Sequence, residues 1–311
     1  MGLDFSSQIG KIKLKNPVLV ASGTFGHAKE FEKFIDLKKL GGVVTKTITL
    51  KPRLGNPPPR IVETPSGMLN AIGLQNPGVE KFIEDKLPYL RKLGIPVIVS
   101  VMAYNVEEFV EVVRRLDREA SIDGFEMNLS CPNVSYGAKT GTDAPKMFAH
   151  DDAMIGEVVG AVRKATTKTL IAKLGPDVSN IGKMAQAAER AGADAVALIN
   201  TFMAMVIDLK TRKPVLANKT GGLSGPCIRP IAVRMVWETF QKVRIPVVGI
   251  GGIMNGRDAA EFLVAGASAV EVGTANFMNP RASMEVLEGL KTFLEGEKVK
   301  NLKEIIGSVR T

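Results

Sequence analysis

Short, nearly continuous apolar runs alternate along the chain with longer segments whose apolar residues recur at helical spacing. Such runs are typical of parallel strands buried on both faces, and the segments between them are typical of crossover helices. Helical spacing is clearest in Val106–Leu116, Ile181–Ala191 and Ala259–Ala265. The runs that we interpret as eight core strands are Val18–Ser22, Gly42–Lys46, Val97–Ser100, Phe125–Asn128, Leu170–Lys173, Ala195–Asn200, Val247–Gly251 and Val270–Gly273. This order predicts an α/β fold, a (β/α)8 or TIM barrel, as a single domain over residues 1–311.

Three connections are too long for a minimal barrel, and each follows the carboxyl end of a predicted strand. They cover residues 47–77, 129–149 and 201–225, and the first is rich in proline and glycine. Long irregular loops in a compact domain usually carry function, and TIM barrels perform their chemistry at the carboxyl ends of the strands. We therefore expect a site beneath these loops.

The residues at the predicted strand ends are unusually polar for a barrel. They are Ser22, Lys46, Ser100, Asn128, Lys173, Asn200, Gly251 and Gly273. A single lysine at a strand end is more often a residue whose ammonium group reaches solvent. Two lysines and two asparagines that point into one barrel mouth would cost several kcal/mol to bury without a ligand. The set therefore predicts an electron-rich planar ligand with carbonyl and carboxylate oxygens.

Glycines cluster where a barrel commonly binds phosphate, after its seventh and eighth strands. Gly251–Gly252 is predicted to close the seventh strand and open a short helix, and Gly273–Thr274 closes the eighth. A third cluster, Gly221–Gly225, precedes them. Backbone N–H groups at a helix start bind a phosphate dianion well, so the pattern predicts a phosphate-bearing cofactor. The chain has neither a dinucleotide-binding G-x-G-x-x-G after its first strand nor a P-loop.

Cys131 is the candidate acid–base residue, because it follows the fourth predicted strand in the polar, proline-containing sequence NLSCPN. A buried structural cysteine is the ordinary interpretation, but a loop over the barrel mouth favours an accessible thiolate able to remove a proton. His27 and His150 are both distant in sequence, so no thiol–histidine pair is expected. Cys227 is interpreted as a packing residue near a helix start.

Composition narrows the class of protein further. The 311 residues carry 41 Lys and Arg against 32 Asp and Glu, a net charge of +9 that is diffuse, and aromatic residues make up only 5%. These values argue against a stacking platform for nucleic acid. Two cysteines exclude a disulfide framework and a four-cysteine cluster within this chain. We expect a cytoplasmic enzyme without a bound metal, a signal peptide or a membrane helix.

Several motifs together resemble dihydroorotate dehydrogenase, in the same order and over nearly the whole chain. They are KTITLKPRLGNPPPR (46–60), NAIGLQNPG (70–78), NLSCPN (128–133), IAKLGPD (171–177), NKTGGLSGP (218–226) and VVGIGGIMNG (247–256). The resemblance implies a TIM barrel that binds one FMN and oxidises dihydroorotate to orotate in pyrimidine (UMP) biosynthesis. It also implies that Cys131 takes the C5 proton while the C6 hydride passes to the flavin, with Lys46 beside the reacting groups.

Further roles follow from the same resemblance. Lys173 would donate a hydrogen bond to the flavin ring and favour its reduced, negatively charged form. The residues expected to bind FMN are Ser22, Lys46, Thr47, Ser100, Asn128, Lys173, Ile199, Gly225, Gly251, Gly252, Gly273 and Thr274. The residues expected to bind the substrate are Lys46, Asn70, Ala71, Ile72, Gly73, Leu74, Asn128, Asn133, Asn200 and Thr201.

The subclass is inferred in one further step. A chain that starts at the barrel and carries cysteine at position 131 resembles class 1 of the family. NKTGGLSGP and Ile207–Ala217 resemble its NAD-linked type B catalytic subunit. That type passes electrons to a partner subunit holding FAD and a 2Fe–2S cluster, in an expected assembly of two plus two chains around a dimer of barrels. Ser100 and Cys227 depart from the residues usual in the family.

Four alternatives stay open at this point. The chain could be the fumarate-linked type A enzyme of the same class, or a related flavin barrel acting on another pyrimidine or on uridine in tRNA. A barrel aldolase or isomerase would use Lys173 as a Schiff base. A binding module without catalysis is the last, although the Lys, Asn and Cys residues at one mouth argue against it.

Overall fold

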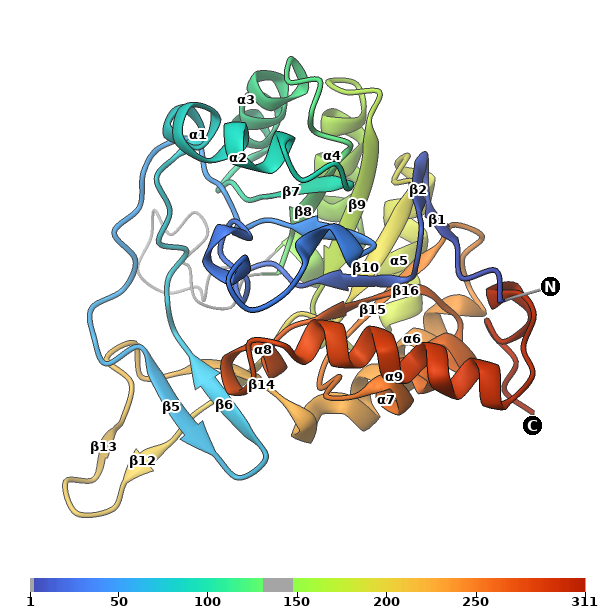
Figure 1. Cartoon of the computed structure of the whole chain (residues 1–311). Helices are drawn as coiled ribbons and strands as arrows, with labels where there is room; N and C mark the ends of the chain where they lie inside the picture. Colours follow the sequence, from blue (N-terminus) through green and yellow to red (C-terminus); the bar gives the residue numbers. More distant parts are fainter. Residues whose placement is uncertain (1–2, 131–147, 311) are drawn as a thin grey trace.

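The computed structural model describes residues 3–130 and 148–310, and its centre is a closed barrel of eight parallel strands (Figure 1). In barrel order the strands are β3 (Val18–Val20), β4 (Gly42–Val44), β7 (Val97–Val101), β8 (Gly124–Asn128), β9 (Thr169–Leu174), β10 (Ala195–Leu198), β15 (Val247–Ile250) and β16 (Ala267–Val272). The barrel closes where Val270 of β16 pairs with Val18 of β3. All eight predicted core strands, and with them the TIM-barrel prediction, are confirmed.

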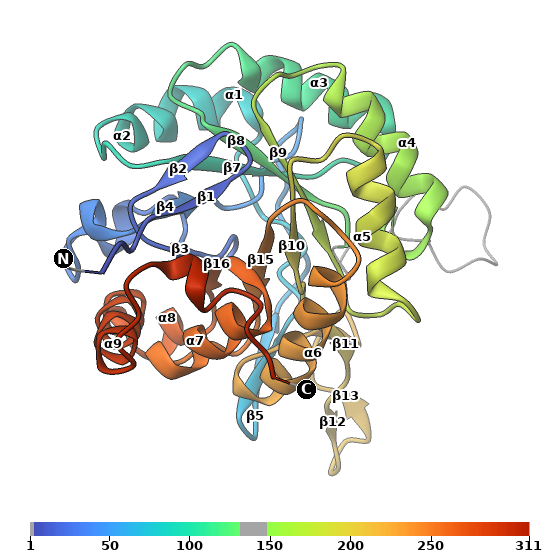
Figure 2. The ribbon, with the colours of Figure 1, turned by 90° about the vertical axis from the view of Figure 1, so that its right-hand side faces the viewer.

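Helices form the outer layer around the barrel (Figure 2). The longer ones are α3 (Val106–Asp117), α4 (Asp152–Arg163), α5 (Ile181–Arg190), α6 (Arg229–Phe240), α7 (Gly256–Ala265) and α9 (Ala282–Gly296). The short helices are α1 (Val79–Lys81), which continues through a π-helical turn into α2 (Leu87–Arg91), and α8 (Ala275–Met278). Asn105, Asp151, Asn180 and Asn255 each cap the start of one long helix by accepting a backbone N–H.

A hairpin of β1 (Ser7–Ile9) and β2 (Ile12–Leu14) packs into the amino-terminal end of the barrel. Its buried side chains belong to the same apolar cluster as Ile171 and Ala269, which lie on barrel strands. The half of the barrel at the amino-terminal ends of the strands is therefore a packed core. The cavity described below lies at the opposite end, where the strands finish.

Two of the three long connections form a sheet and are not the irregular loops that the sequence predicts. Residues 47–77 contain β5 (Ile61–Thr64) and β6 (Gly67–Asn70). Residues 201–225 contain β11 (Phe202–Ala204), β12 (Ile207–Asp208), β13 (Lys213–Pro214) and β14 (Gly221–Ser224). β14 pairs with β6 (Figure 1), which gives an antiparallel sheet in the order β11-β14-β6-β5. The β6–β14 pairing joins segments about 150 residues apart, so no local sequence pattern predicts it.

Candidate active site

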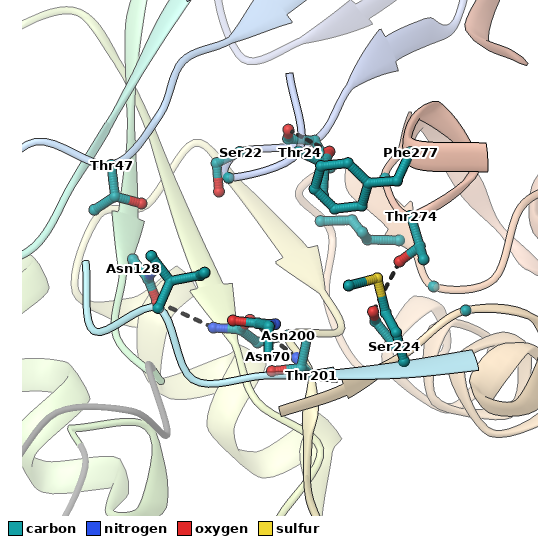
Figure 3. A pocket seen from close by; sticks show the side chains of 18 of the residues that line it. Ser22, Thr24, Thr47, Asn70, Asn128, Asn200, Thr201, Ser224, Thr274 and Phe277 are labelled. Atoms are coloured by element: carbon teal, nitrogen blue, oxygen red, sulfur yellow. Dashed lines mark hydrogen bonds between the residues drawn. The ribbon is translucent and has the colours of Figure 1, made fainter. Parts of the chain in front are cut away.

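A cavity of about 410 Å³ lies between the carboxyl ends of the barrel strands and the four-stranded sheet (Figure 3). This volume is within the range of small-molecule and cofactor sites. The predicted site residues that line the cavity are Ser22, Lys46, Thr47, Asn70, Ile72, Gly73, Leu74, Asn128, Lys173, Ile199, Asn200, Thr201, Gly225, Gly251, Gly252, Gly273 and Thr274. Residues as far apart in the sequence as Ser22 and Thr274 are thus gathered around one space.

Two of the predicted site residues do not line the cavity. Ser100 is fully buried within β7, where its hydroxyl lies 3.0 Å from the Thr47 hydroxyl and so supports a residue that does line it. Ala71 is buried against Leu69 and Leu216, which fixes the segment whose neighbours Asn70 and Ile72 face the cavity. Cys131 and Asn133 lie outside the described residues.

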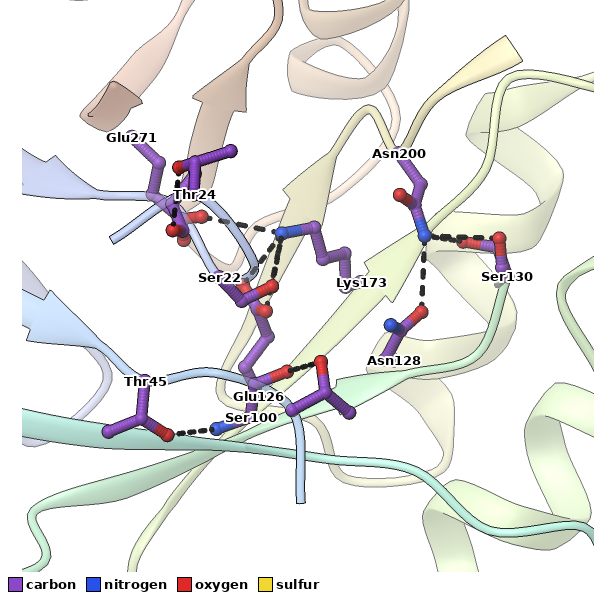
Figure 4. A network of polar contacts seen from close by, with 12 residues as sticks. Ser22, Thr24, Thr45, Ser100, Glu126, Asn128, Ser130, Lys173, Asn200 and Glu271 are labelled. Atoms are coloured by element: carbon purple, nitrogen blue, oxygen red, sulfur yellow. Dashed lines mark hydrogen bonds and ion pairs between the residues drawn. The ribbon is translucent and has the colours of Figure 1, made fainter. Parts of the chain in front are cut away.

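Lys173 lines the floor of the cavity and belongs to a buried cluster of one ammonium and two carboxyl groups (Figure 4). Lys173 Nζ lies 3.3 Å from Glu126 Oε1 and 3.4 Å from Glu271 Oε2. The same Nζ is 3.3 Å from the Ser22 hydroxyl. Lys173, Glu126 and Glu271 are at most 4% exposed, so the three groups are held almost without water.

The buried surroundings shift the pKa of both Glu271 and Lys173. Burial and the adjacent Glu126 carboxylate raise the pKa of Glu271 well above its ordinary value, against the opposing effect of Lys173. Burial alone would lower the pKa of Lys173, but the charges of Glu126 and Glu271 outweigh it and raise that pKa. A lysine held charged in this way is unsuited to attack a carbonyl. This observation counts against the Schiff-base alternative.

Glu126 and Glu271 are the functional residues that the sequence analysis missed. Each stands inside an apolar strand, and the sequence interpretation gave acidic residues no role because none showed metal-ligand spacing. The available signal was a carboxylate on the inward face of an apolar core strand. Inward residues alternate along a strand, so Glu126 and Asn128 point to the same side of β8.

A second polar group joins the amides of β8 and β10. Asn200 Nδ2 donates to Asn128 Oδ1 at 3.1 Å and to the backbone carbonyl of Ser130 at 3.0 Å. Internal partners therefore satisfy this amide as well as Lys173, which corrects the argument that a ligand is needed to offset their burial. The hydrogen bonds to the Asn128 amide and to the carboxyl groups orient Asn200 and Lys173 before any ligand binds.

Glycines form the other end of the cavity, where three loops approach one another closely. A Cβ on Gly252 would lie 2.7 Å from the Gly225 carbonyl oxygen and 2.8 Å from Arg229 Cβ. A Cβ on Gly225 would lie 2.8 Å from Gly67 Cα, and all three of Gly225, Gly251 and Gly252 have positive φ. Only glycine fits this cradle without displacing backbone. Beside it, the Thr274 hydroxyl donates to the Ser224 hydroxyl at 2.8 Å.

The helix expected directly after Gly251–Gly252 is wrong in position. β15 ends at Ile250, and α7 begins only at Gly256 behind its Asn255 cap. Gly252 instead packs against Arg229 at the start of α6, a helix of 12 residues. The positive end of a helix still lies at the glycine cradle, but it belongs to the strand–helix unit before the one predicted.

Three observations outside the cavity complete the comparison with the sequence. Cys227 is exposed, so its interpretation as a packing residue is wrong. It sits in a short turn ahead of α6, where its thiol donates to the Ser224 carbonyl of β14 at 3.8 Å and lies beside Gly67 of β6. No group of three potential metal ligands occurs within residues 3–130 and 148–310. No helix in those ranges is long and apolar enough to cross a bilayer.

Comparison with known proteins gives the same family along nearly the full length. The family model for dihydroorotate dehydrogenase matches residues 5–294. Proteins named dihydroorotate dehydrogenase B (NAD(+)), catalytic subunit, are 51% identical over 308 residues in Geotalea uraniireducens and 51% over 304 residues in Trichlorobacter lovleyi. The protein of that name in Thermodesulfovibrio yellowstonii is 50% identical over 303 residues. These alignments cover 97–99% of this chain and 98–99% of the relatives. The chain belongs to the dihydroorotate dehydrogenase family.

Proposed function

We propose that the chain oxidises dihydroorotate to orotate with FMN, as the catalytic subunit of an NAD-linked enzyme of pyrimidine biosynthesis. The observation that carries this proposal is the end-to-end similarity, at about half of all positions, to proteins named for that activity and that subunit. The cavity supports it independently, because amides, an ammonium and a glycine cradle face one space of cofactor size.

The residues present fit FMN in particular. The cradle of Gly225, Gly251 and Gly252 leaves room for backbone to approach a phosphate, and the start of α6 adds a positive dipole there. Thr274 and Ser224 offer hydroxyl groups beside it. At the far end Lys173 places a positive charge where a planar ring system would gain electrons. Bound FMN would supply the acceptor for a hydride taken from the substrate.

The chain's own residues would bind and orient the substrate and move one proton. Asn128 and Asn200 already share a hydrogen bond, and Asn70 and Thr201 line the same part of the cavity (Figure 3). These groups would grip the carbonyl, N–H and carboxylate groups of a pyrimidine. Cys131, predicted as the base, follows directly after the described Ser130, whose carbonyl accepts from Asn200. It would remove the C5 proton of dihydroorotate.

The electron acceptor is the less direct part of the proposal. The relatives are called catalytic subunits, which supports a separate electron-transfer chain. This chain has two cysteines, too few to hold a 2Fe–2S cluster with four cysteine ligands. We therefore place FAD and that cluster on the partner, in an assembly of two catalytic and two electron-transfer chains.

The test is anaerobic reduction of the purified chain by dihydroorotate. We expect a yellow protein with one FMN per chain, whose flavin absorbance is bleached by dihydroorotate, and NAD reduction only when the electron-transfer subunit is added. A chain that retains no FMN, or a flavin that dihydroorotate leaves oxidised, would overturn the proposal. Fumarate-dependent turnover by the chain alone would replace the NAD-linked assignment with the fumarate-linked one.

A further inference from the structure

The cluster of Lys173, Glu126 and Glu271 contains one more acid than the lysine needs. Both carboxyl groups lie within 3.4 Å of the same Nζ, and all three residues come from different barrel strands (Figure 4). The other hydrogen-bond partner of Nζ among the described residues is the neutral Ser22 hydroxyl. One ammonium balances one carboxylate, so two ionised carboxylates would leave an uncompensated negative charge in a dry interior.

Burial makes that extra charge expensive. Glu126 is 0% exposed and Glu271 is 1% exposed, so solvent cannot screen their repulsion. Two carboxyl groups in such a site ionise one at a time, and the second keeps its proton. The cluster is then neutral overall, with one ammonium, one carboxylate and one carboxylic acid.

We propose that Glu126 and Glu271 are interchangeable positioning residues, which share one proton and one negative charge so that either alone holds Lys173 charged at the cofactor cavity. The inference rests on the FMN site proposed above. Removing one carboxyl group moves the negative charge onto the other, and the remaining acid loses its proton to do so. Removing both leaves the ammonium without an anion, so it must lose its proton or admit water.

Four variants test this redundancy. Glu126→Gln and Glu271→Gln keep the shape of each side chain, and the double variant combines them. Glu189→Gln is the matched control, because Glu189 accepts a backbone N–H from Arg244 at 2.7 Å, far from the cavity. For each protein, the dissociation constants of oxidised and reduced FMN and the stability of the FMN-free chain are measured.

We expect each single variant to weaken the preference for reduced over oxidised FMN by less than about threefold. The double variant should weaken it by more than about tenfold beyond the product of the singles, since neighbouring groups that share one charge are not additive. Lowering the pH should restore the preference in the double variant, because Lys173 regains its proton. A purely structural role would not give that recovery.

Stability of the FMN-free chain supplies a readout independent of the cofactor. The double variant should unfold at lower denaturant than either single variant. Adding Lys173→Met should recover much of that loss, because the unpaired charge is then gone. If the double variant equals the product of the singles, or if Glu271→Gln alone matches the double variant, the inference is wrong. If wild-type chain binds no FMN, the proposed function fails, and the stability series still decides the inference.

Discussion

The two ends of the cavity are built from different parts of the chain. At the cradle, Gly225, Gly251 and Gly252 present backbone, and the close approaches leave no room for a side chain. At the floor, Lys173 presents an ammonium group that Glu126 and Glu271 hold from beneath. The first end therefore depends on shape, because its glycines carry no side chain that titrates. The second depends on charge, and a change to one group alters the protonation of its neighbours.

The largest expected effect belongs to neither end. Cys131→Ala should lower the rate of flavin reduction by dihydroorotate about 10²- to 10⁴-fold, because a positioned base contributes that much to a proton transfer. FMN content should stay at the wild-type level, since cradle and floor are untouched. Stopped-flow reduction under anaerobic conditions measures the rate. Cys131→Ser should recover part of it at high pH, where a hydroxyl gives up its proton more readily. A Cys131→Ala rate near wild type would remove the cysteine from the chemistry.

The next effect tests the end made of backbone. Gly252→Ala places a Cβ 2.7 Å from the Gly225 carbonyl oxygen, in a conformation with φ of +71° that disfavours any side chain. We expect FMN to bind at least about tenfold more weakly, equally at pH 6 and pH 8, as measured by fluorescence titration. Gly156→Ala is the matched control, because nothing lies within 4 Å of its added Cβ and α4 gains a better helix former. A Gly252→Ala protein with unchanged affinity would show that the loops can separate.

The contrast between the two ends also explains what the sequence could predict. Strand ends follow from apolar runs, so Lys46, Asn128 and Lys173 were placed at one barrel mouth from sequence alone, and they line the cavity. The glycines were found as a cluster, yet their contact with the start of α6 was not, because that contact joins two strand–helix units.

The carboxylates were missed for a different physical reason. Glu126 and Glu271 are 145 positions apart, and their closeness follows only from barrel closure, which brings β8 and β16 to face each other across one interior. The pattern of apolar and polar residues within one strand does not show which other strand it will face in the closed barrel. The β6–β14 sheet was missed likewise, since its strands are short and pair across about 150 residues. The predicted roles of Cys131 and Asn133 stay predictions, because both lie outside the described residues.

The cluster around Lys173 should also make the free energy of unfolding depend on pH. Glu271 has a raised pKa when folded, so between its unfolded pKa near 4.5 and the raised folded value the native chain holds a proton that the unfolded chain has lost. The contribution of this group is complete below pH 4.5 and is lost as pH rises through that window, at up to about 1.4 kcal/mol per pH unit. Denaturant titrations from pH 4.5 to 8 should show this slope relative to Glu271→Gln. Parallel curves would mean that Glu271 is ionised when folded.

His27, a buried histidine that is not among the residues lining the cavity, gives a pH dependence of the opposite sign. Burial lowers the pKa of His27 from its ordinary 6.5 to about 4, with repulsion from Lys86 and Lys46 adding to it and Glu30 opposing it. Stability from this group is complete above pH 6.5 and falls as pH drops toward 4, by about 3 kcal/mol at most. His27→Gln should flatten that part of the curve. An unchanged acid slope in His27→Gln would show that the imidazole protonates freely in the native chain.

The smallest expected effect concerns the cradle again. There the hydroxyl groups of Thr274 and Ser224 add two uncharged polar groups to a site that is otherwise defined by its shape. Ser224→Ala removes the acceptor of the 2.8 Å bond from Thr274 and leaves the glycine backbone in place. A neutral hydrogen bond contributes about 1 kcal/mol, so FMN should bind no more than about fivefold more weakly. Ser308→Ala, which removes a hydroxyl bonded to the Ile305 carbonyl far from the cavity, is the control for a lost serine. A loss as large as that of Gly252→Ala would mean that hydroxyl groups, and not the backbone cradle, hold the phosphate end, and the contrast between the two ends would disappear.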